Sequence, residues 1–214
     1  MPATSRDVLT CLSRMADVIE ENKKYLTKLD SPIGDADHGV NLNRGFKAIL
    51  DKTSSLEDEP AGTILRTAGT ALVSNVGGAA GPLYGSGLMQ AGSAVSGKHE
   101  LDAEDILKAL EAALEGVVKR GKASPGDKTM VDTLTAAVAA MERAVKAGAG
   151  TAEALDEAAQ AGKQAMKDTI PMLARKGRAS YLGERSIGHQ DPGATSTYLL
   201  IQVLADCARE KELG

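Results

Sequence analysis

The sequence predicts an all-α protein that forms a single domain over residues 1–214, and three observations indicate this. Aromatic residues make up only 2 % of the 214 residues, whereas β-sheets prefer aromatic and β-branched residues. Apolar residues recur three or four positions apart along most of the chain, which is the period of an amphipathic helix. The length suits one domain or at most two, and the sequence has neither an internal repeat nor a linker long enough to divide it.

Eight helices are expected, in the order of the chain. The first is predicted over 5–28 by an apolar stripe that consists of Val8, Leu12, Met15, Ile19 and Leu26. Apolar periodicity or Ala-rich composition predicts the other seven over 40–50, 61–73, 82–95, 102–118, 131–145, 152–174 and 192–207.

Residues at the ends of these segments support the predicted boundaries. Asp191-Pro192 is typical of an N-cap followed by proline at the first helical position. Gly121 and Gly148 follow helical stretches and suit the left-handed conformation that ends many helices. Pro171 is expected to kink or interrupt the seventh helix, because proline cannot donate the helical hydrogen bond.

Charge and composition argue against several classes of function. The net charge is −4, from 25 Lys and Arg against 29 Asp and Glu, and no basic block occurs, which disfavours nucleic acid or a membrane surface as the main partner. The sequence shows no signal peptide and no apolar run near the ~18 residues of a membrane span. Cys11 and Cys207 cannot by themselves build a disulfide framework or a metal cluster. We therefore expect a reduced, cytoplasmic protein.

The loop over 30–39 carries the clearest chemical signal. Asp30, Asp35 and Asp37 bring three carboxylates together within eight residues, and such close like charges repel unless a cation neutralises them. Oxygen ligands alone suit Mg²⁺ or Ca²⁺ rather than zinc. The alternative is that these aspartates only cap helices or face solvent in a turn.

Three further loops, over 75–82, 119–129 and 177–193, are also rich in glycine or charge. Gly77, Gly78 and Gly81 suit either an anion at a helix N-terminus or close helix packing. Arg178 suits a phosphate contact and Asp191 a ribose hydroxyl, besides its N-cap role. Because carboxylates and a nucleotide triphosphate repel each other, the anion is expected to enter with its metals, two Mg²⁺ ions.

Five motifs follow one another along the chain, over residues 34–39, 76–85, 126–132, 177–185 and 188–194. Together they resemble the nucleotide-binding L subunits of dihydroxyacetone kinases, and the resemblance covers essentially the whole chain. It implies a barrel of about eight antiparallel helices with the nucleotide site in loops at one end.

The resemblance also implies the site residues. Asp30, Asp35 and Asp37 match the aspartates that hold two Mg²⁺ against the phosphates of ADP or ATP. The positions that match nucleotide contacts are His38, Gly39, Val40, Asn41, Ala79, Ala80, Gly121, Met130, Arg178, Asp191, Pro192 and Gly193. Members commonly carry a serine where Ala79-Ala80 stand, so here only backbone N–H groups are left to hold phosphate. No side chain is assigned as catalytic, since phosphoryl transfer needs mainly positioning and charge neutralisation.

The implied function is that of a phosphotransferase subunit from the phosphoenolpyruvate-dependent branch. ADP would stay bound as a coenzyme, would be rephosphorylated by a phosphohistidine carrier subunit, and would pass the phosphoryl group to dihydroxyacetone on a partner K subunit. A homodimer is the expected assembly, without a nucleic-acid or membrane partner.

Two alternatives stay open at the level of the sequence. One is an ATP-dependent kinase component for another ketose or a related substrate. The other is a nucleotide-loaded binding module that regulates a transcription regulator.

Overall fold

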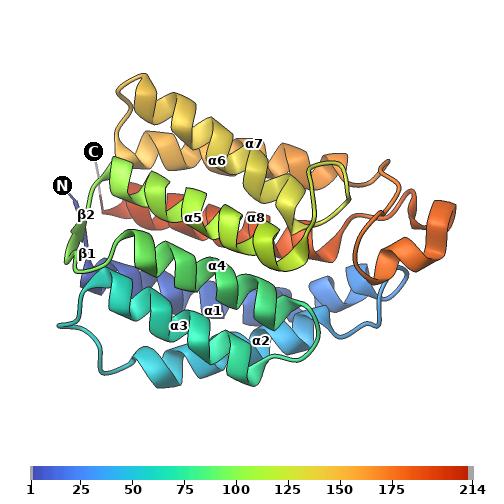
Figure 1. The fold of residues 1–214 in the computed structure, drawn as a ribbon, viewed down its shortest axis with the longest axis horizontal. Helices are drawn as coiled ribbons and strands as arrows, with labels where there is room; N and C mark the ends of the chain where they lie inside the picture. Colours follow the sequence, from blue (N-terminus) through green and yellow to red (C-terminus); the bar gives the residue numbers. More distant parts are fainter. Residues whose placement is uncertain (1, 212–214) are drawn as a thin grey trace.

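Eight α-helices and one 3-10 helix lie within residues 2–211, the part of the chain that this computed structural model describes (Figure 1). The α-helices are α1 (Ser5–Asp30), α2 (His38–Thr53), α3 (Ala61–Asn75), α4 (Ala80–Ala94), α5 (Ala103–Gly121), α6 (Met130–Lys146), α7 (Thr151–Asp168) and α8 (Pro192–Glu210). The 3-10 helix η1 (Arg178–Ser186) stands between α7 and α8. The all-helical prediction is therefore confirmed.

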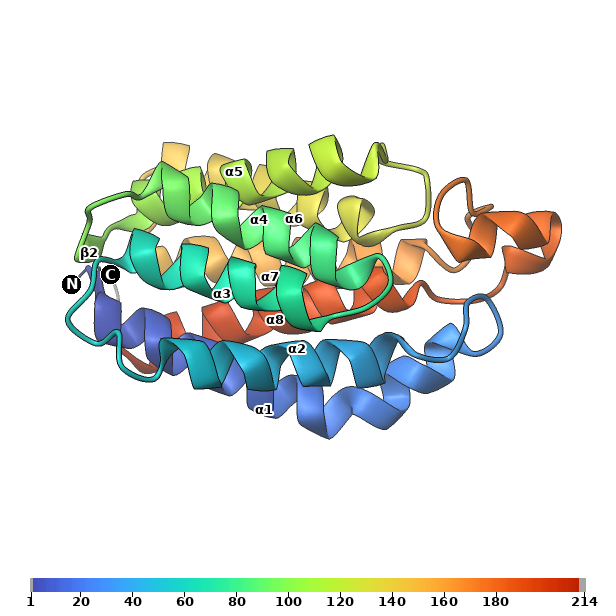
Figure 2. The same ribbon diagram turned by 60° about the horizontal axis from the view of Figure 1, so that its bottom comes forward.

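The helices pack in the order of the chain, each against the next. Helix α8 also packs against α1 and α6, so that the contacts between neighbouring helices close a ring (Figure 2). The expected barrel remains a prediction, which this order of contacts supports. No helix in the described part of the chain is both long and apolar enough to cross a membrane.

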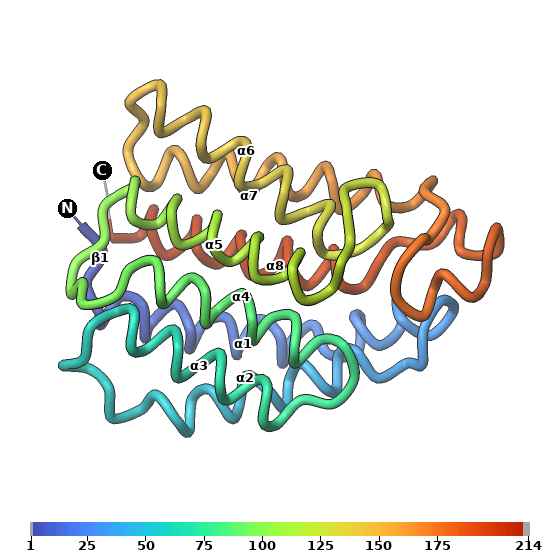
Figure 3. The backbone as a smooth tube through the Cα atoms, in the orientation of Figure 1, coloured from blue at the N-terminus to red at the C-terminus, as the bar shows by residue number. Residues whose placement is uncertain are grey.

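The two ends of the helix bundle differ in character. One end holds the first described residues, the end of α8 and a small antiparallel sheet, in which β1 (Ala3–Thr4) pairs with β2 (Glu100–Leu101) (Figure 3). The long connections after α1, α5 and α7 lie at the opposite end (Figures 1 and 3). The sheet was not predicted, because two residues per strand leave no alternating pattern to detect.

Helix ends follow the expected chemistry with two differences. Helix α7 ends at Asp168 rather than at 174, because Pro171 cannot continue a helix and disfavours helical backbone at the residue before it. Lys122, rather than Gly121, takes the left-handed conformation after α5, with φ of 51°. Gly148 has φ of 87°, as predicted.

The interior is apolar and tightly packed. Its largest fully buried side chains include Ile19, Leu42 and Phe46. Helices α3 and α4 approach through facing glycines, because a Cβ atom at Gly69 would lie 2.7 Å from the carbonyl oxygen of Gly85. This contact leaves room for backbone only.

Candidate functional site

A cavity of about 620 Å³ lies at the end of the bundle that carries the long loops. Residues from all four loops that the sequence analysis identified line it. The predicted site residues among its lining are Asp30, Asp35, Asp37, His38, Asn41, Ala79, Ala80, Gly121, Met130, Arg178, Asp191, Pro192 and Gly193. The fold therefore brings most of the predicted residues to one cavity, although they lie up to 163 positions apart in the chain, between Asp30 and Gly193.

Two predicted nucleotide contacts, Gly39 and Val40, are not part of the lining. Gly39 is buried against α1, where a Cβ atom would lie 2.1 Å from the carbonyl oxygen of Lys23. Val40 is 52 % exposed on the surface of α2. Close packing against α1 is therefore sufficient to explain why a glycine occupies position 39, whether or not it contacts a ligand.

The three aspartates form the acidic side of the cavity. One carboxylate oxygen from each of Asp30, Asp35 and Asp37 lies within 4.8 Å of the others. Asp30 is buried at the end of α1, and its Oδ2 atom accepts hydrogen bonds from the backbone N–H groups of Asp37 at 3.0 Å and His38 at 3.2 Å. Between the other two aspartates, Ala36 adopts a left-handed φ of 59°. The loop thus turns sharply enough to bring the three carboxylates together.

The electrostatics of this cluster favour a bound cation. Burial raises the pKa of Asp37 above its ordinary value, and the neighbouring Asp35 and Asp30 raise it further. A divalent ion would relieve the electrostatic repulsion between three carboxylates at this separation, and their all-oxygen donor set fits Mg²⁺. The residues present therefore fit the expected metal.

The N-terminus of α4 also lines this cavity. Gly77, Gly78, Ala79 and Ala80 all line it, and among the described residues no side chain caps this helix end. The first N–H groups of a helix lack partners within the helix and carry a positive partial charge. Backbone donors at this position are suited to a phosphate group.

His38 is held by a chain of hydroxyl groups that sequence reasoning missed. Its Nε2 atom lies 2.9 Å from Oγ of Ser196, which lies 2.7 Å from the hydroxyl of Tyr84. Tyr84 is also 2.8 Å from Oγ1 of Thr197. Burial lowers the pKa of His38, so its imidazole is neutral at pH 7. These partners come from helices far apart in the sequence, and although Tyr84 lies in the motif over 76–85, no local pattern marks its contacts with Ser196 and Thr197.

Asp191, the N-cap residue of α8, lines the cavity. Its Oδ1 atom accepts a hydrogen bond of 2.6 Å from the N–H of Ala194, which confirms the predicted N-cap. Burial raises the pKa of Asp191 to about 7, with a smaller increase from Asp132, while the Ala194 hydrogen bond and Lys128 lower it. The predicted ribose contact remains a prediction.

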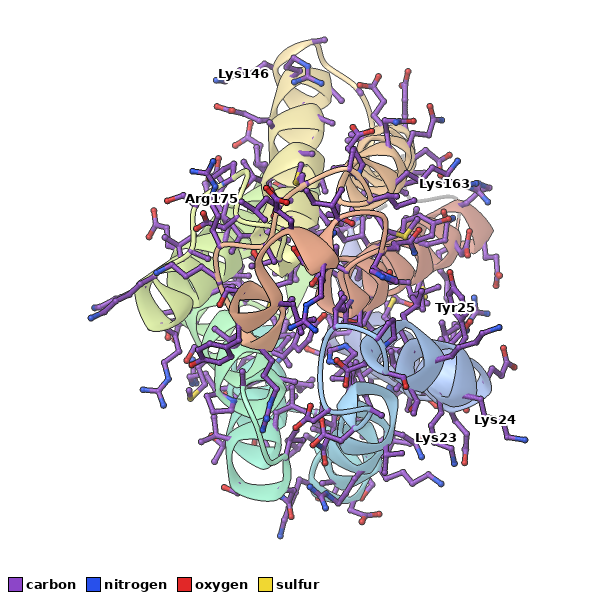
Figure 4. All side chains as sticks on the ribbon, turned by 90° about the vertical axis from the view of Figure 1, so that its right-hand side faces the viewer. Lys23, Lys24, Tyr25, Lys146, Lys163 and Arg175 are labelled. Atoms are coloured by element: carbon purple, nitrogen blue, oxygen red, sulfur yellow. The ribbon has the colours of Figure 1, made fainter. Side chains whose placement is uncertain are left out.

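The residues over 169–190, here called the cap segment, contain η1, and Lys176, Gly177, Arg178 and Ala179 of this segment line the cavity. Its Arg178 pairs with Asp35 at 2.8 Å, which joins the cap segment to the aspartate loop. Figure 4 views this end of the molecule, with Arg175 of the cap segment and Tyr25 of α1 labelled on its two sides. A hydrogen bond of 3.4 Å from Gln190 to the hydroxyl of Tyr25 links the end of the cap segment to α1.

Several residues that line the cavity were not predicted, including three cations. Arg120, Lys128 and Lys176 belong to the lining, together with Tyr84 and Thr129. Arg120 and Lys176 directly precede glycines of two recognised loops, Gly121 and Gly177, so their positions could have been found from the sequence. Lys128 and Tyr84 lie within the motifs over 126–132 and 76–85, but their contacts are made with distant segments that the sequence does not reveal.

Comparisons with known proteins agree on one family. A DAK2 domain matches residues 32–206. The chain is 43 % identical over 210 residues to the Escherichia coli K12 protein named PEP-dependent dihydroxyacetone kinase, ADP-binding subunit DhaL, covering 98 % of this chain and 100 % of that protein. It is 38 % identical over 205 residues to the PTS-dependent dihydroxyacetone kinase, ADP-binding subunit DhaL, of Lactococcus lactis, covering 91 % of this chain and 93 % of that protein.

A solved structure shares the fold. The dihydroxyacetone kinase of C. freundii in complex with AMP-PNP and Mg²⁺ superposes with a TM-score of 0.73 at 22 % sequence identity. The match covers 96 % of this chain but 34 % of that one. At this identity the likeness supports the fold alone.

Proposed function

The chain belongs to the family of DAK2 domains, and from this premise we propose that it is the ADP-binding subunit of a phosphoenolpyruvate-dependent dihydroxyacetone kinase. Near full-length similarity to subunits with that name supports the assignment. The observation that carries it is one cavity whose lining contains both three clustered carboxylates and the N-terminus of α4, which no side chain caps. Such a cavity suits a metal-bound polyphosphate, because the anion would find backbone donors and its cations in the same cavity.

The site residues divide the work of holding the nucleotide. Asp30, Asp35 and Asp37 would hold Mg²⁺, two ions in our proposal, and this metal would neutralise charge on the transferring phosphoryl group. The backbone N–H groups of Ala79 and Ala80 would donate to the phosphates in place of a hydroxyl. Catalysis then rests on positioning and charge neutralisation, and no side chain needs to act as a nucleophile.

The cap segment and the floor of the cavity would position the rest of the nucleotide. The guanidinium group of Arg178 would contact the phosphates. Gly121 and Met130 would line the adenine pocket, and Asp191 at the start of α8 would accept a hydrogen bond from a ribose hydroxyl. His38 would contribute a neutral imidazole fixed by Ser196. With the cap segment and the aspartate loop both in contact with it, ADP would remain bound between turnovers.

The partners follow from this role. We propose that a K subunit presents dihydroxyacetone to the bound nucleotide and that a phosphohistidine carrier restores the phosphoryl group on ADP. A homodimer and an additional contact with a transcription regulator belong to the same proposal. Pull-down from cells that express the tagged full chain would identify each of these proteins by mass spectrometry.

The decisive experiment is native mass spectrometry of the purified protein, followed by nucleotide analysis after denaturation. We expect one ADP per chain together with Mg²⁺. A protein that is empty as purified and exchanges ATP freely would replace the coenzyme assignment by an ATP-dependent kinase component. Absence of binding to either nucleotide with Mg²⁺ supplied would overturn the proposed function.

A further inference from the structure

A buried lysine, Lys128, lies at the root of the cap segment. It belongs to the loop before α6, is only 1 % exposed, and adopts a left-handed φ of 63°. Such a backbone conformation is strained for a residue with a side chain. A buried cation and a strained backbone at the same residue indicate that its position is fixed by strong contacts.

The contacts of Lys128 are three backbone carbonyl groups. Its Nζ atom donates to the carbonyl oxygens of Ser186 at 2.7 Å, Met172 at 3.0 Å and Ile170 at 3.4 Å. Ile170 and Met172 stand at the beginning of the cap segment and Ser186 stands near its end. One ammonium group therefore joins the two ends of the cap segment at its base.

Neighbouring hydrogen bonds complete this anchor. The hydroxyl of Ser186 accepts from the N–H of Ala174 at 2.9 Å and donates to the carbonyl of Gly183 at 2.7 Å. The N–H of Arg175 donates to the carbonyl of Asp127, next to the lysine, at 3.1 Å. Lys128 and Ser186 thus hold the base of the cap segment, beside a backbone hydrogen bond of 2.8 Å from Gly188 to the carbonyl of Ile170, while Arg178 extends from it toward the aspartate loop.

We propose that Lys128 is a positioning residue for nucleotide retention, and that it acts by anchoring the cap segment so that Arg178 lies over the phosphate site. This inference rests on the proposed function. It assigns a role to a residue that lines the cavity without being a ligand of the nucleotide.

The hydrogen-bond capacity of the ammonium group supports an indirect role. A protonated lysine has three N–H donors and no acceptor, and all three match carbonyl oxygens of the cap segment. No donor is left for a phosphate, in contrast to a lysine that binds phosphate as a free point charge. Removing the ammonium would leave the carbonyl oxygens of Met172 and Ser186 without this donor, which is costly, whereas the carbonyl of Ile170 would keep the N–H of Gly188 at 2.8 Å.

The test is a double-mutant cycle on the rate of ADP release. We expect Lys128→Met to speed release about tenfold, the effect of losing one charge-assisted anchor, and Ser186→Ala to speed it less. If Lys128 acts through the cap segment, either substitution combined with Arg178→Ala will release ADP no faster than Arg178→Ala alone. If the substitution only destabilised the fold, its effect on the ADP release rate would instead multiply with the effect of Arg178→Ala.

Two controls keep the inference separate from the proposed function. Lys146→Met, at the exposed end of α6, should leave ADP release unchanged. Hydrogen exchange of the cap-segment amides in nucleotide-free protein should be faster in Lys128→Met and Ser186→Ala, whether or not the wild type binds ADP. Unchanged exchange and release in both variants, or fully multiplicative effects with Arg178→Ala, would overturn the inference.

Discussion

The guanidinium group of Arg178 lies 2.8 Å from the carboxylate of Asp35, and this ion pair connects the cap segment to the aspartate loop. Asp35 is also one of the three proposed metal ligands. Two cations, Arg178 and Mg²⁺, thus compete for one carboxylate. In this proposal, metal binding would weaken the ion pair and leave Arg178 free to turn toward the phosphates.

The first prediction is that Arg178→Ala has opposite effects on metal and nucleotide. Mg²⁺ affinity without nucleotide should rise by about 1.4- to fivefold, because a partly exposed ion pair contributes only ~0.2–1 kcal/mol. ADP should dissociate faster, because the cap segment loses its phosphate contact. Titration calorimetry with Mg²⁺ and stopped-flow release of fluorescent ADP measure the two effects. Identical ADP release rates would contradict the role of Arg178.

The second prediction concerns the aspartate cluster. Asp35→Asn and Asp37→Asn should each abolish Mg²⁺-dependent nucleotide binding, because an amide supplies no negative charge to the metal. The helical content should stay the same, since both residues lie in the loop between α1 and α2. Calorimetry with ADP and Mg²⁺, beside circular dichroism, makes the measurement.

Asp51→Asn is a matched control for this pair, because Asp51 is exposed on α2 and lies outside the cavity lining. It should bind ADP with Mg²⁺ as the wild type does. If Asp35→Asn and Asp37→Asn also kept their affinity, the metal site would have to lie elsewhere.

The third prediction concerns the glycines between α3 and α4. Gly69→Ala should destabilise the protein by about 1–3 kcal/mol, because the added Cβ would lie 2.7 Å from the carbonyl oxygen of Gly85. Gly162→Ala is the matched change in α7, where the nearest atom lies at 3.5 Å. There the better helix propensity of alanine should stabilise by up to about 1 kcal/mol. Equal urea midpoints for the two variants would contradict this account of the packing.

Local signals made most of the helices predictable. The apolar stripe of the first helix and the Asp191-Pro192 cap depend on residues close in sequence, and the structure reproduces both. The aspartate cluster was visible because its three members lie within eight residues. Each of these patterns can be recognised in the sequence without knowing how the helices pack.

Long-range contacts explain what the sequence did not reveal. Ser196 meets His38 across 158 positions and Tyr84 across 112, and the ammonium of Lys128 reaches carbonyl groups 42, 44 and 58 residues ahead. From the sequence alone, a lysine in a Gly- and Asp-rich loop is expected to be exposed to solvent. Lys128 is buried because the cap segment packs over it. The helix η1 was not predicted, because its nine residues lack the repeating period of a long helix.

The last prediction uses the pKa of Asp191, which burial raises to about 7, against about 3.9 for aspartate in an unfolded chain. Between these two values the folded protein holds a proton that the unfolded chain has released. The free energy of unfolding contributed by this group is therefore greatest below about pH 4 and falls as the pH rises toward 7.

Asp191→Asn tests this linkage, because asparagine keeps an oxygen acceptor for the N–H of Ala194 but cannot ionise. The free energy of unfolding of the variant, relative to that of the wild type, should increase between pH 5 and pH 7.5 and should then stay constant. Urea unfolding of both proteins with EDTA and without nucleotide excludes linkage from ligand binding. Parallel pH profiles would mean that the carboxyl group of Asp191 is ionised throughout, and that Lys128 and the N-terminus of α8 outweigh the cost of its burial.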